Sequence, residues 1–176
     1  CPSPARATLA DYQSAVTNET SLISYYTFDQ SDAADVRGTN SGTLMGTTAF
    51  ATGVGGVGKA LSLAGLGWVN LGVVEDFAFD DLTGSAEAWV QAKASLGGND
   101  TIFANQDGLS RWAIHMNSDK GGIGMWNGSM YYYDTTCPIP NPSTNWHHLV
   151  VVFDSASFTV YWDGALAGSK TVPLGY

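Results

Sequence analysis

Apolar and polar residues alternate with a period of two in much of the chain, and this is the pattern of strands that bury one face. Residues 111–117 and 158–162 alternate in this way. Residues 148–153 form an apolar run, as expected for a central strand. Further β-rich runs lie at 22–28 and 85–91. We therefore expect a strand at each of these five places.

Turn signals separate the expected strands. Glycine-rich, Asp-Gly or Asn-Gly sequences occur at residues 53–58, 107–108, 127–128 and 163–164, and such residues favour tight turns between paired strands. Many short strands with little helix are typical of antiparallel sandwiches. The pattern thus predicts an all-β fold, an antiparallel β-sandwich of jelly-roll type, over residues 21–176.

Residues 1–20 differ from the rest and are expected to form an N-terminal arm. Two prolines stiffen its first four residues, because proline fixes φ and restricts the residue before it. Thr8 is placed to cap a short helix in which Leu9, Tyr12 and Val16 form one stripe. Two interpretations stay open: a tail that lies on its own domain, or an arm that docks on a neighbouring chain.

The composition excludes some classes of binding partner. Seven Lys plus Arg against 16 Asp plus Glu give a formal net charge of −9. Nucleic acid and anionic membrane surfaces are poor partners for such a chain, because both attract basic faces. Charged residues are only 13% of the chain, against about 25% in typical domains. No apolar run of about 18 residues is present, so no transmembrane segment is expected.

Two cysteines and three glycosylation triplets point weakly to an extracellular or cell-surface location. Cys1 and Cys137 allow one disulfide bridge, within a chain or between two chains, in an oxidising compartment. Asn18, Asn99 and Asn127 each begin an Asn-x-Ser/Thr triplet. Because the sequence begins with cysteine rather than methionine, we expect a processed chain or a fragment.

Two neighbouring segments carry a family resemblance. Residues 145–154 and 158–164 resemble the paired strands most typical of laminin-G-like, concanavalin A-like jelly rolls. Weaker similarities lie at 25–29, 35–40, 42–44 and 85–91, and 58–63 with 68–71 resembles the family's next hairpin. The resemblance implies a jelly roll over roughly residues 21–172. It leaves function open, because such domains bind sugars, proteins or steroids, carry glycosidase sites, or build structures.

The C-terminal end departs from that family. Relatives continue through one or two more strands, whereas this sequence stops at residues 172–176. The resemblance then implies a sheet position that is unfilled, or filled by a strand or arm from a neighbouring chain. An open edge invites such pairing, and head-to-tail pairing builds filaments or rings. The alternatives are a shortened chain or a member that packs differently.

Catalytic patterns are sparse, and we expect a protein that is not an enzyme. Jelly-roll glucanases that share this architecture use a Glu-x-Asp-x-x-Glu strand, since glycoside hydrolysis needs two carboxylates. The three glutamates, Glu19, Glu75 and Glu87, fall outside that pattern. His147 and His148 are adjacent, so alternation puts them on opposite faces of a strand. We expect one of them to be buried and the other to lie at the surface.

No cofactor is required by the sequence, but the resemblance implies a calcium ion at a loop rim. Calcium prefers oxygen ligands such as carboxylates and amide carbonyls. For each candidate alone, a solvated turn residue is the simpler interpretation. The weak candidates are Asp35, Asn40, Asn105, Asp107 and Asp134.

The densest aromatic patch lies at residues 125–133. Aromatic rings stack on sugar faces and anchor protein interfaces, and a third interpretation is that half of them face the core of a strand pair. The candidate contact residues are Trp126, Tyr131, Tyr132 and Tyr133.

Two functions follow from these observations. The first is a structural or adhesive protein that assembles with copies of itself into a fibril, through the arm of residues 1–20 and the open sandwich edge. The alternative is a carbohydrate-binding, lectin-like module whose partners are glycans, with or without calcium. The sequence favours the first slightly, because of the stiffened arm and the shortened end.

Overall fold

The computed structural model describes residues 8–63, 65–77, 83–92, 99–106, 110–117, 122–126, 131–138, 144–154 and 157–171. The chain forms two compact units, Cys1–Val74 and Glu75–Tyr176. The expected boundary between an arm and a sandwich at residues 20 and 21 is not tested by this division and stays a prediction. Within the described residues, no helix has the length and apolar character needed to cross a membrane.

The N-terminal unit contains one helix and two small antiparallel sheets. Strand β1 pairs with β4, and β2 pairs with β3. The expected hairpin of 58–63 with 68–71 is therefore wrong, because β3 and β4 pair with different strands. The elements are α1 (Leu9–Thr17), β1 (Thr43–Met45), β2 (Thr48–Thr52), the 3₁₀ turn η1 (Val54–Gly56), β3 (Lys59–Leu63) and β4 (Trp68–Asn70).

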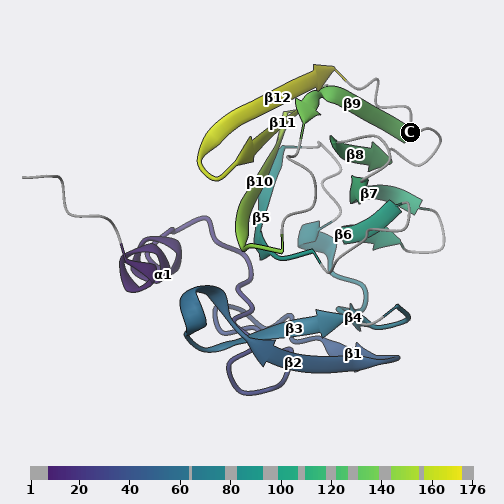
Figure 1. Cartoon of the computed structure of the whole chain (residues 1–176). Coiled ribbons are helices and arrows are strands. Elements are labelled where there is room, and N and C mark those ends of the chain that lie inside the picture. The colour runs from purple at the N-terminus through teal and green to yellow at the C-terminus, as the bar shows by residue number, and fades with distance from the viewer. Residues whose placement is uncertain are drawn as a thin grey trace, which may run out of the picture. The chain divides into compact units, whose positions relative to one another are not determined.

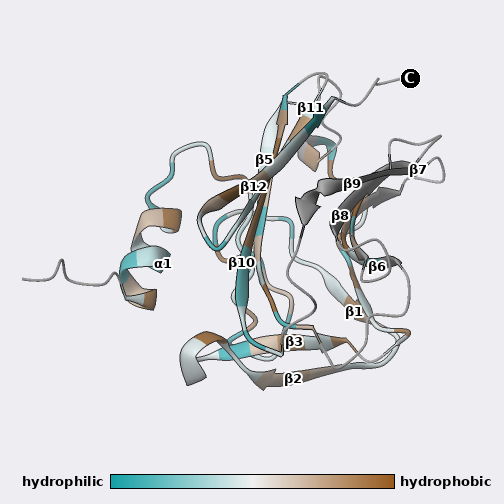
Figure 2. Ribbon diagram, turned by 45° about the horizontal axis from the view of Figure 1, so that its top comes forward, coloured by the Kyte–Doolittle hydropathy of each residue, from teal (hydrophilic) through white to brown (hydrophobic). Residues whose placement is uncertain are grey.

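Helix α1 begins where the sequence predicts. The Thr8 hydroxyl accepts the N–H of Asp11 at 3.2 Å, and the Asp11 carboxylate accepts the N–H of Thr8 at 2.7 Å. This reciprocal pair is a capping box, which satisfies N–H groups that the first helical turn leaves without partners. Figure 2 shows apolar and polar residues alternating along α1. The stripe of Leu9, Tyr12 and Val16 is half-buried, and no residue of the helix is fully buried.

The strand expected at residues 22–28 is absent. The backbone N–H of Tyr25 donates to the carboxylate of Asp35 at 2.9 Å, and the carbonyl of Tyr25 accepts the N–H of Val36 at 2.9 Å. Phe28 has a φ of 62°, which interrupts an extended chain. The segment thus bonds to a loop around Asp35 instead of to a strand, although its residues have high β propensity.

The C-terminal unit is an antiparallel β-sandwich, as predicted. One sheet has the order β12-β11-β10-β5 and the other β6-β7-β8-β9 (Figure 1). Strands fall at four of the five places where the sequence predicts them. The elements are the 3₁₀ turn η2 (Glu75–Phe77), β5 (Gly84–Val90), β6 (Asn99–Gln106), β7 (Ser110–Asn117), β8 (Gly122–Trp126), β9 (Tyr131–Pro138), β10 (His147–Asp154), β11 (Ser157–Trp162) and β12 (Ala165–Thr171).

Strand β12 forms the sheet edge at which the sequence predicts that a neighbouring chain would add a strand or arm. This strand is at the end of its sheet order and lies beside β9, the end strand of the other sheet (Figure 1). Residues 172–176, where the family would continue, are outside the described residues. Completion by a neighbouring chain stays a prediction.

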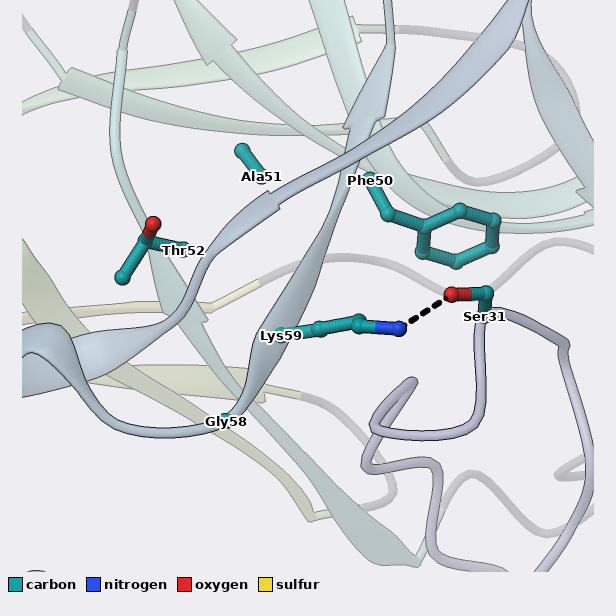
Figure 3. Close-up of a pocket in the computed structure, with 6 residues that line it drawn as sticks. All are labelled: Ser31, Phe50, Ala51, Thr52, Gly58 and Lys59. Carbon is teal, nitrogen blue, oxygen red and sulfur yellow. Dashed lines mark hydrogen bonds between the residues drawn. The ribbon is translucent and has the colours of Figure 1, made fainter.

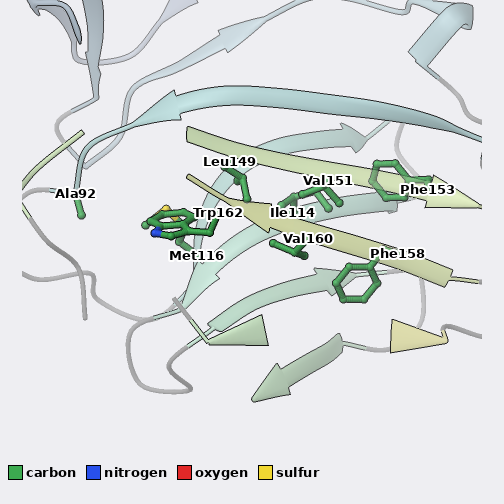
Figure 4. Close-up of a cluster of buried hydrophobic side chains, with 9 residues drawn as sticks. All are labelled: Ala92, Ile114, Met116, Leu149, Val151, Phe153, Phe158, Val160 and Trp162. Carbon is green, nitrogen blue, oxygen red and sulfur yellow. The ribbon is translucent and has the colours of Figure 1, made fainter. Parts of the chain in front are cut away.

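Alternate residues of three strands fill the core between the two sheets. Strand β7 contributes Ile114 and Met116, as its alternation predicts, while β10 and β11 contribute the larger share (Figure 4). The largest fully buried side chain is that of Phe158. The polar face expected for β7 is also covered, because Ala113 and His115 are 2% and 5% exposed. The nine core residues are Ala92, Ile114, Met116, Leu149, Val151, Phe153, Phe158, Val160 and Trp162.

Candidate functional site

An open hollow of about 510 Å³ lies at the loop end of the β2–β3 hairpin in the N-terminal unit. The hairpin register places Thr52 opposite Lys59 and Phe50 opposite Leu61. Ser31 approaches from the loop that precedes β1 (Figure 3). The lining residues are Ser31, Phe50, Ala51, Thr52, Gly58 and Lys59.

The glycine-rich loop 53–58 determines where Lys59 begins its strand. The N–H of Gly53 donates to the carbonyl of Gly58 at 3.1 Å, which closes the loop. Gly58 has a φ of 62°, and a Cβ there would clash with the carboxylate of Asp29. That carboxylate accepts the backbone N–H of Lys59 at 2.8 Å. Glycine is required at residue 58 because it allows both the left-handed φ and this close approach.

The side chains in the hollow combine a ring with hydrogen-bonding groups. The ammonium group of Lys59 donates to the hydroxyl of Ser31 at 2.6 Å, and the half-buried ring of Phe50 lies near this pair (Figure 3). Thr52 adds a second hydroxyl. The six lining residues include no carboxylate, imidazole or thiol. The hollow can therefore stack a flat apolar face and donate or accept hydrogen bonds, but it contains no acid–base pair for hydrolysis.

A second surface is the outer face of the β12-β11-β10-β5 sheet. The ladder registers place Glu87, Val150, Tyr161 and Leu166 in one row across the four strands. Tyr161 and Leu166 are 37% and 64% exposed. In the next row, the ring centroids of Trp89 and His148 are 5.0 Å apart, and the imidazole of His148 lies 3.5 Å from the carboxylate of Glu87. Tyr161 is thus exposed on this face, whereas the Trp89 and His148 rings are half-buried.

The two histidines lie on opposite faces of β10, as alternation predicts. On the inner side, His147 stacks on Trp162 with ring centroids 4.8 Å apart, and its Nδ1 lies 2.7 Å from the Asp163 carboxylate. The expected contrast between a buried and a surface histidine is wrong, because the two side chains are 17% and 18% exposed. Burial raises the pKa of Asp163, but hydrogen bonds from His147 and from the N–H of His148 outweigh it and lower the pKa.

Asp35, a calcium candidate, uses its carboxylate to hold a loop. It accepts the N–H groups of Tyr25, Arg37 and Gly38 on one oxygen, at 2.9–3.0 Å, and that of Asn40 on the other, at 3.2 Å. The residue is 9% exposed. Burial raises the pKa of this carboxyl, but the hydrogen bonds outweigh it and lower the pKa to about 2. Both oxygens thus have protein donors already.

The other calcium candidates do not gather with Asp35 into a described site. The side-chain amide of Asn40 donates to the hydroxyl of Ser24 at 2.9 Å. Asn105 lies in β6 and Asp134 in β9, at the two ends of one sheet order, and Asp107 is outside the described residues. Among the residues that the structure describes, no three His, Cys, Asp or Glu side chains are grouped as metal ligands. Calcium binding stays a prediction.

The predicted aromatic patch falls on β8 and β9. In their ladder, Trp126 is opposite Tyr131, Met125 is opposite Tyr132, and Gly124 is opposite Tyr133. The backbone register thus places Trp126 and Tyr131 opposite each other, and the patch itself stays a prediction. Whether the rings bind sugars or a partner stays a prediction.

The remaining candidates concern covalent modification. Cys137 lies in β9, and Cys1 is outside the described residues, so the bridge stays a prediction. Asn18 is the exposed C-cap of α1, Asn99 begins β6, and Asn127 is outside the described residues. Glycosylation at these three residues is likewise untested.

Sequence reasoning did not select the residues of the hollow. Phe50, Ser31 and Thr52 belong to no motif, and Ser31 meets Lys59 only through the fold. A signal was present in the glycine-rich loop 53–58, which ends directly before Lys59 at the start of β3. Such a loop between two short strands predicts a hairpin whose end residues lie close together.

Comparison with solved structures identifies a similar sugar-bound domain. The chain is similar to domain 4 of AbnA, a GH43 extracellular arabinanase from Geobacillus stearothermophilus, solved in complex with arabinotriose. The TM-score is 0.64 and the sequence identity 28%, over 85% of this chain and 75% of that chain. No curated protein matches the sequence.

The family resemblance seen in the strand pair 145–154 and 158–164 is confirmed by a family comparison. The family described as the concanavalin A-like lectin/glucanases superfamily matches residues 64–175, which is more than half of the chain. The sandwich topology of the C-terminal unit agrees with that match. The chain belongs to the concanavalin A-like lectin/glucanases superfamily.

Proposed function

We propose that this chain is a non-catalytic carbohydrate-binding domain. The observation that carries the proposal is its likeness, over 85% of its length, to a domain that was solved with arabinotriose. The proposal is the second of the two functions that the sequence suggested. Its likeness to part of an extracellular arabinanase also supports an extracellular location.

The hollow at the β2–β3 hairpin supplies the chemistry that a sugar requires. A pyranose or furanose ring has one apolar face and several hydroxyl groups, so its receptor needs an aromatic ring beside hydrogen-bonding side chains. Phe50 supplies the ring, while Ser31, Thr52 and Lys59 supply hydroxyl and ammonium groups. The Lys59–Ser31 hydrogen bond holds two of these groups together before a ligand arrives, which reduces the entropy lost on binding.

The absence of catalysis is part of the proposal. The lining of the hollow includes no pair of carboxylates, and a glycosidase needs one acid and one base or nucleophile. The nearest approach to an acid–base pair on the outer sheet face is His148 with Glu87, which are held 3.5 Å apart. Glycosidases use two carboxyl groups about 5 Å or more apart, and this pair supplies only one carboxylate.

Binding of arabinotriose, measured by titration calorimetry, tests the function. Two variants locate the site, because each removes one aromatic ring from a different surface: Phe50→Ala in the hollow and Tyr161→Ala on the outer sheet face. We expect wild type and Tyr161→Ala to bind with the same affinity and Phe50→Ala to bind about fivefold more weakly, since stacking contributes on the order of 1 kcal/mol.

Several outcomes would contradict the proposal. If calorimetry detects no binding of arabinotriose or of larger arabinan fragments, the proposed carbohydrate-binding function is wrong. Loss of binding in Tyr161→Ala, with Phe50→Ala unchanged, would keep the function and move it to the outer sheet face. Release of reducing sugar from the arabinan fragments would show that the chain hydrolyses them and is a catalytic domain.

Self-assembly into a fibril stays a prediction from the sequence. The stripe of Leu9, Tyr12 and Val16 is half-buried within the chain itself, which agrees with a tail that lies on its own domain as well as with a docking arm. Sedimentation of the purified chain over a range of concentrations separates the two, because only the docking arm makes the sedimentation coefficient rise with concentration.

A further inference from the structure

Lys59 places a positive charge in the hollow of a chain whose formal net charge is −9. Its ammonium group donates one hydrogen bond, to Ser31 at 2.6 Å. Within the described residues it forms no ion pair, whereas His147 and His148 each face a carboxylate. An ammonium group has three N–H donors, so the Ser31 bond leaves two of them for a ligand.

The neighbouring carboxylate of Asp29 does not take the place of such a ligand. Its Oδ1 accepts the backbone N–H of Lys59 at 2.8 Å and lies against the backbone of Gly58. Asp29 is thus directed to the main chain of the loop rather than to the ammonium group. The hollow therefore keeps a cation beside the ring of Phe50, with hydroxyl groups on both sides (Figure 3).

We propose that the hollow prefers sugars that carry a carboxylate, the uronic acids, over neutral sugars of the same shape. This inference rests on the proposed function and names the class of its ligand. The ring of Phe50 takes the apolar face of the sugar, Lys59 pairs with the carboxylate, and Ser31 and Thr52 bond to hydroxyl groups. Hydrogen bonds between charged partners are roughly twice as strong as those between neutral ones, which is the source of the preference.

The net charge of −9 repels long acidic ligands, but it does not exclude short ones that carry the same carboxylate groups. Charges farther apart than about 8 Å are largely screened at physiological ionic strength, whereas Lys59 and a bound sugar carboxylate would lie well within that distance. A short acidic oligosaccharide gains the contact with Lys59 and meets little of the distant repulsion. The matching ligand is thus a short oligouronide.

The test compares trigalacturonic acid with its methyl ester, which differ only in charge and the ester methyl groups. Titration calorimetry at about 0.15 M salt, where the screening length is about 8 Å, measures both affinities. Lys59→Gln removes the cation and Lys59→Arg keeps it. Lys170→Gln is the matched control, because it lies in β12 of the other unit and changes the formal charge equally, from −9 to −10 (−9 − 1).

We expect wild type, Lys170→Gln and Lys59→Arg to bind the acid about threefold more tightly than the ester, as an ion pair at an exposed lysine allows, and Lys59→Gln to bind both alike. Equal affinity of wild type for acid and ester, or identical behaviour of Lys59→Gln and Lys170→Gln, would overturn the inference. If arabinotriose binds and the acid gains nothing, the inference fails while the proposed function stands. If neither sugar binds, both fail.

Discussion

The two units of the chain are stabilised by different means. The C-terminal unit has nine buried apolar residues in one cluster, six of them from β10 and β11. In the described part of the N-terminal unit, Ala33 is the only hydrophobic residue in the buried class, and the Asp35 carboxylate with its four N–H donors organises the loop before β1. One unit thus depends on apolar burial and the other on hydrogen bonds to a carboxylate.

The candidate hollow lies in the unit whose described residues form the smaller apolar core. A sandwich filled with apolar side chains has little space for polar groups, because every unpaired polar atom inside it costs free energy. The N-terminal unit keeps Ser31, Thr52 and Lys59 at a solvent-open hollow instead. Scaffold and contact residues are therefore separated along the sequence, and substitutions in the two units should have separable effects.

The largest effect is expected from Phe158→Ala in the C-terminal core. Phe158 is fully buried, and removing a buried phenyl ring loses its transfer free energy and leaves a cavity, at a cost of about 3–5 kcal/mol. Urea denaturation measures the loss, and Tyr161→Ala on the same strand, at an outward position that is 37% exposed, is the control with a much smaller cost. Equal losses in the two variants would contradict a core placed between the sheets.

Amide hydrogen exchange extends the same comparison to the other unit. In Phe158→Ala, we expect faster exchange in β10 and β11 and unchanged exchange at Tyr25, Arg37 and Gly38, whose N–H groups bond to Asp35. Faster exchange at those three amides as well would show that the two units open together, and would contradict their separate stabilisation.

The two units also differ in how well the sequence predicts them. Strands β7 and β11 follow from alternation and β10 follows from an apolar run, because each strand packs its own residues against a single core. Residues 22–28 are also rich in residues that favour strands, but Asp35, ten residues from Tyr25, accepts the Tyr25 N–H that a neighbouring strand would have used. Hydrogen bonds from a distant side chain leave no periodic signal in the sequence.

The candidate site shows the same limit. The predicted patch at residues 125–133 rests on composition, and its register in β8 and β9 agrees with adjacent aromatic residues. The hollow depends on Ser31 meeting Lys59 across 28 residues, a contact that only the folded loop creates. The calcium candidate Asp35 was chosen for its oxygen atoms, but those atoms already accept four backbone N–H groups. Residue type indicates the available chemistry, while the fold decides which partner it meets.

An intermediate effect is expected from Asp35→Asn, which keeps the shape of the side chain and removes its charge. The folded-state pKa of about 2 lies below the ordinary value of 3.8. Asp35 therefore contributes stability that is fully present above pH 4 and is lost as the pH falls through about 2. The difference of nearly two pKa units corresponds to about 2 kcal/mol at neutral pH.

Amide exchange at Tyr25, Arg37 and Gly38 measures this contribution at pH 6 and at pH 3. In wild type, we expect the protection to fall between these two values, and in Asp35→Asn to be low at both. Protection in Asp35→Asn equal to that of wild type at pH 6 would show that the charge does not hold the loop. None of the nine core residues is titratable, but buried His115 and the His147–Asp163 pair lie in the same unit. The comparison of wild type with Asp35→Asn, rather than exchange in β10 and β11, is therefore the control for the change of pH.

The smallest effect is expected from Thr8→Ala at the start of α1. The variant removes the hydroxyl that accepts the N–H of Asp11, at a cost of about 1 kcal/mol to the helix. A helix of nine residues with none buried has few other stabilising contacts, since isolated helices shorter than about 12 residues are marginal in water.

Amide hydrogen exchange at residues 9–17 should become faster in Thr8→Ala, while Thr8→Ser, which keeps the hydroxyl, should match wild type. Because α1 contributes no residue to the C-terminal core, exchange in β10 and β11 should stay unchanged. Unaltered protection of α1 in Thr8→Ala would mean that contacts of the Leu9–Tyr12–Val16 stripe, rather than its cap, hold the helix.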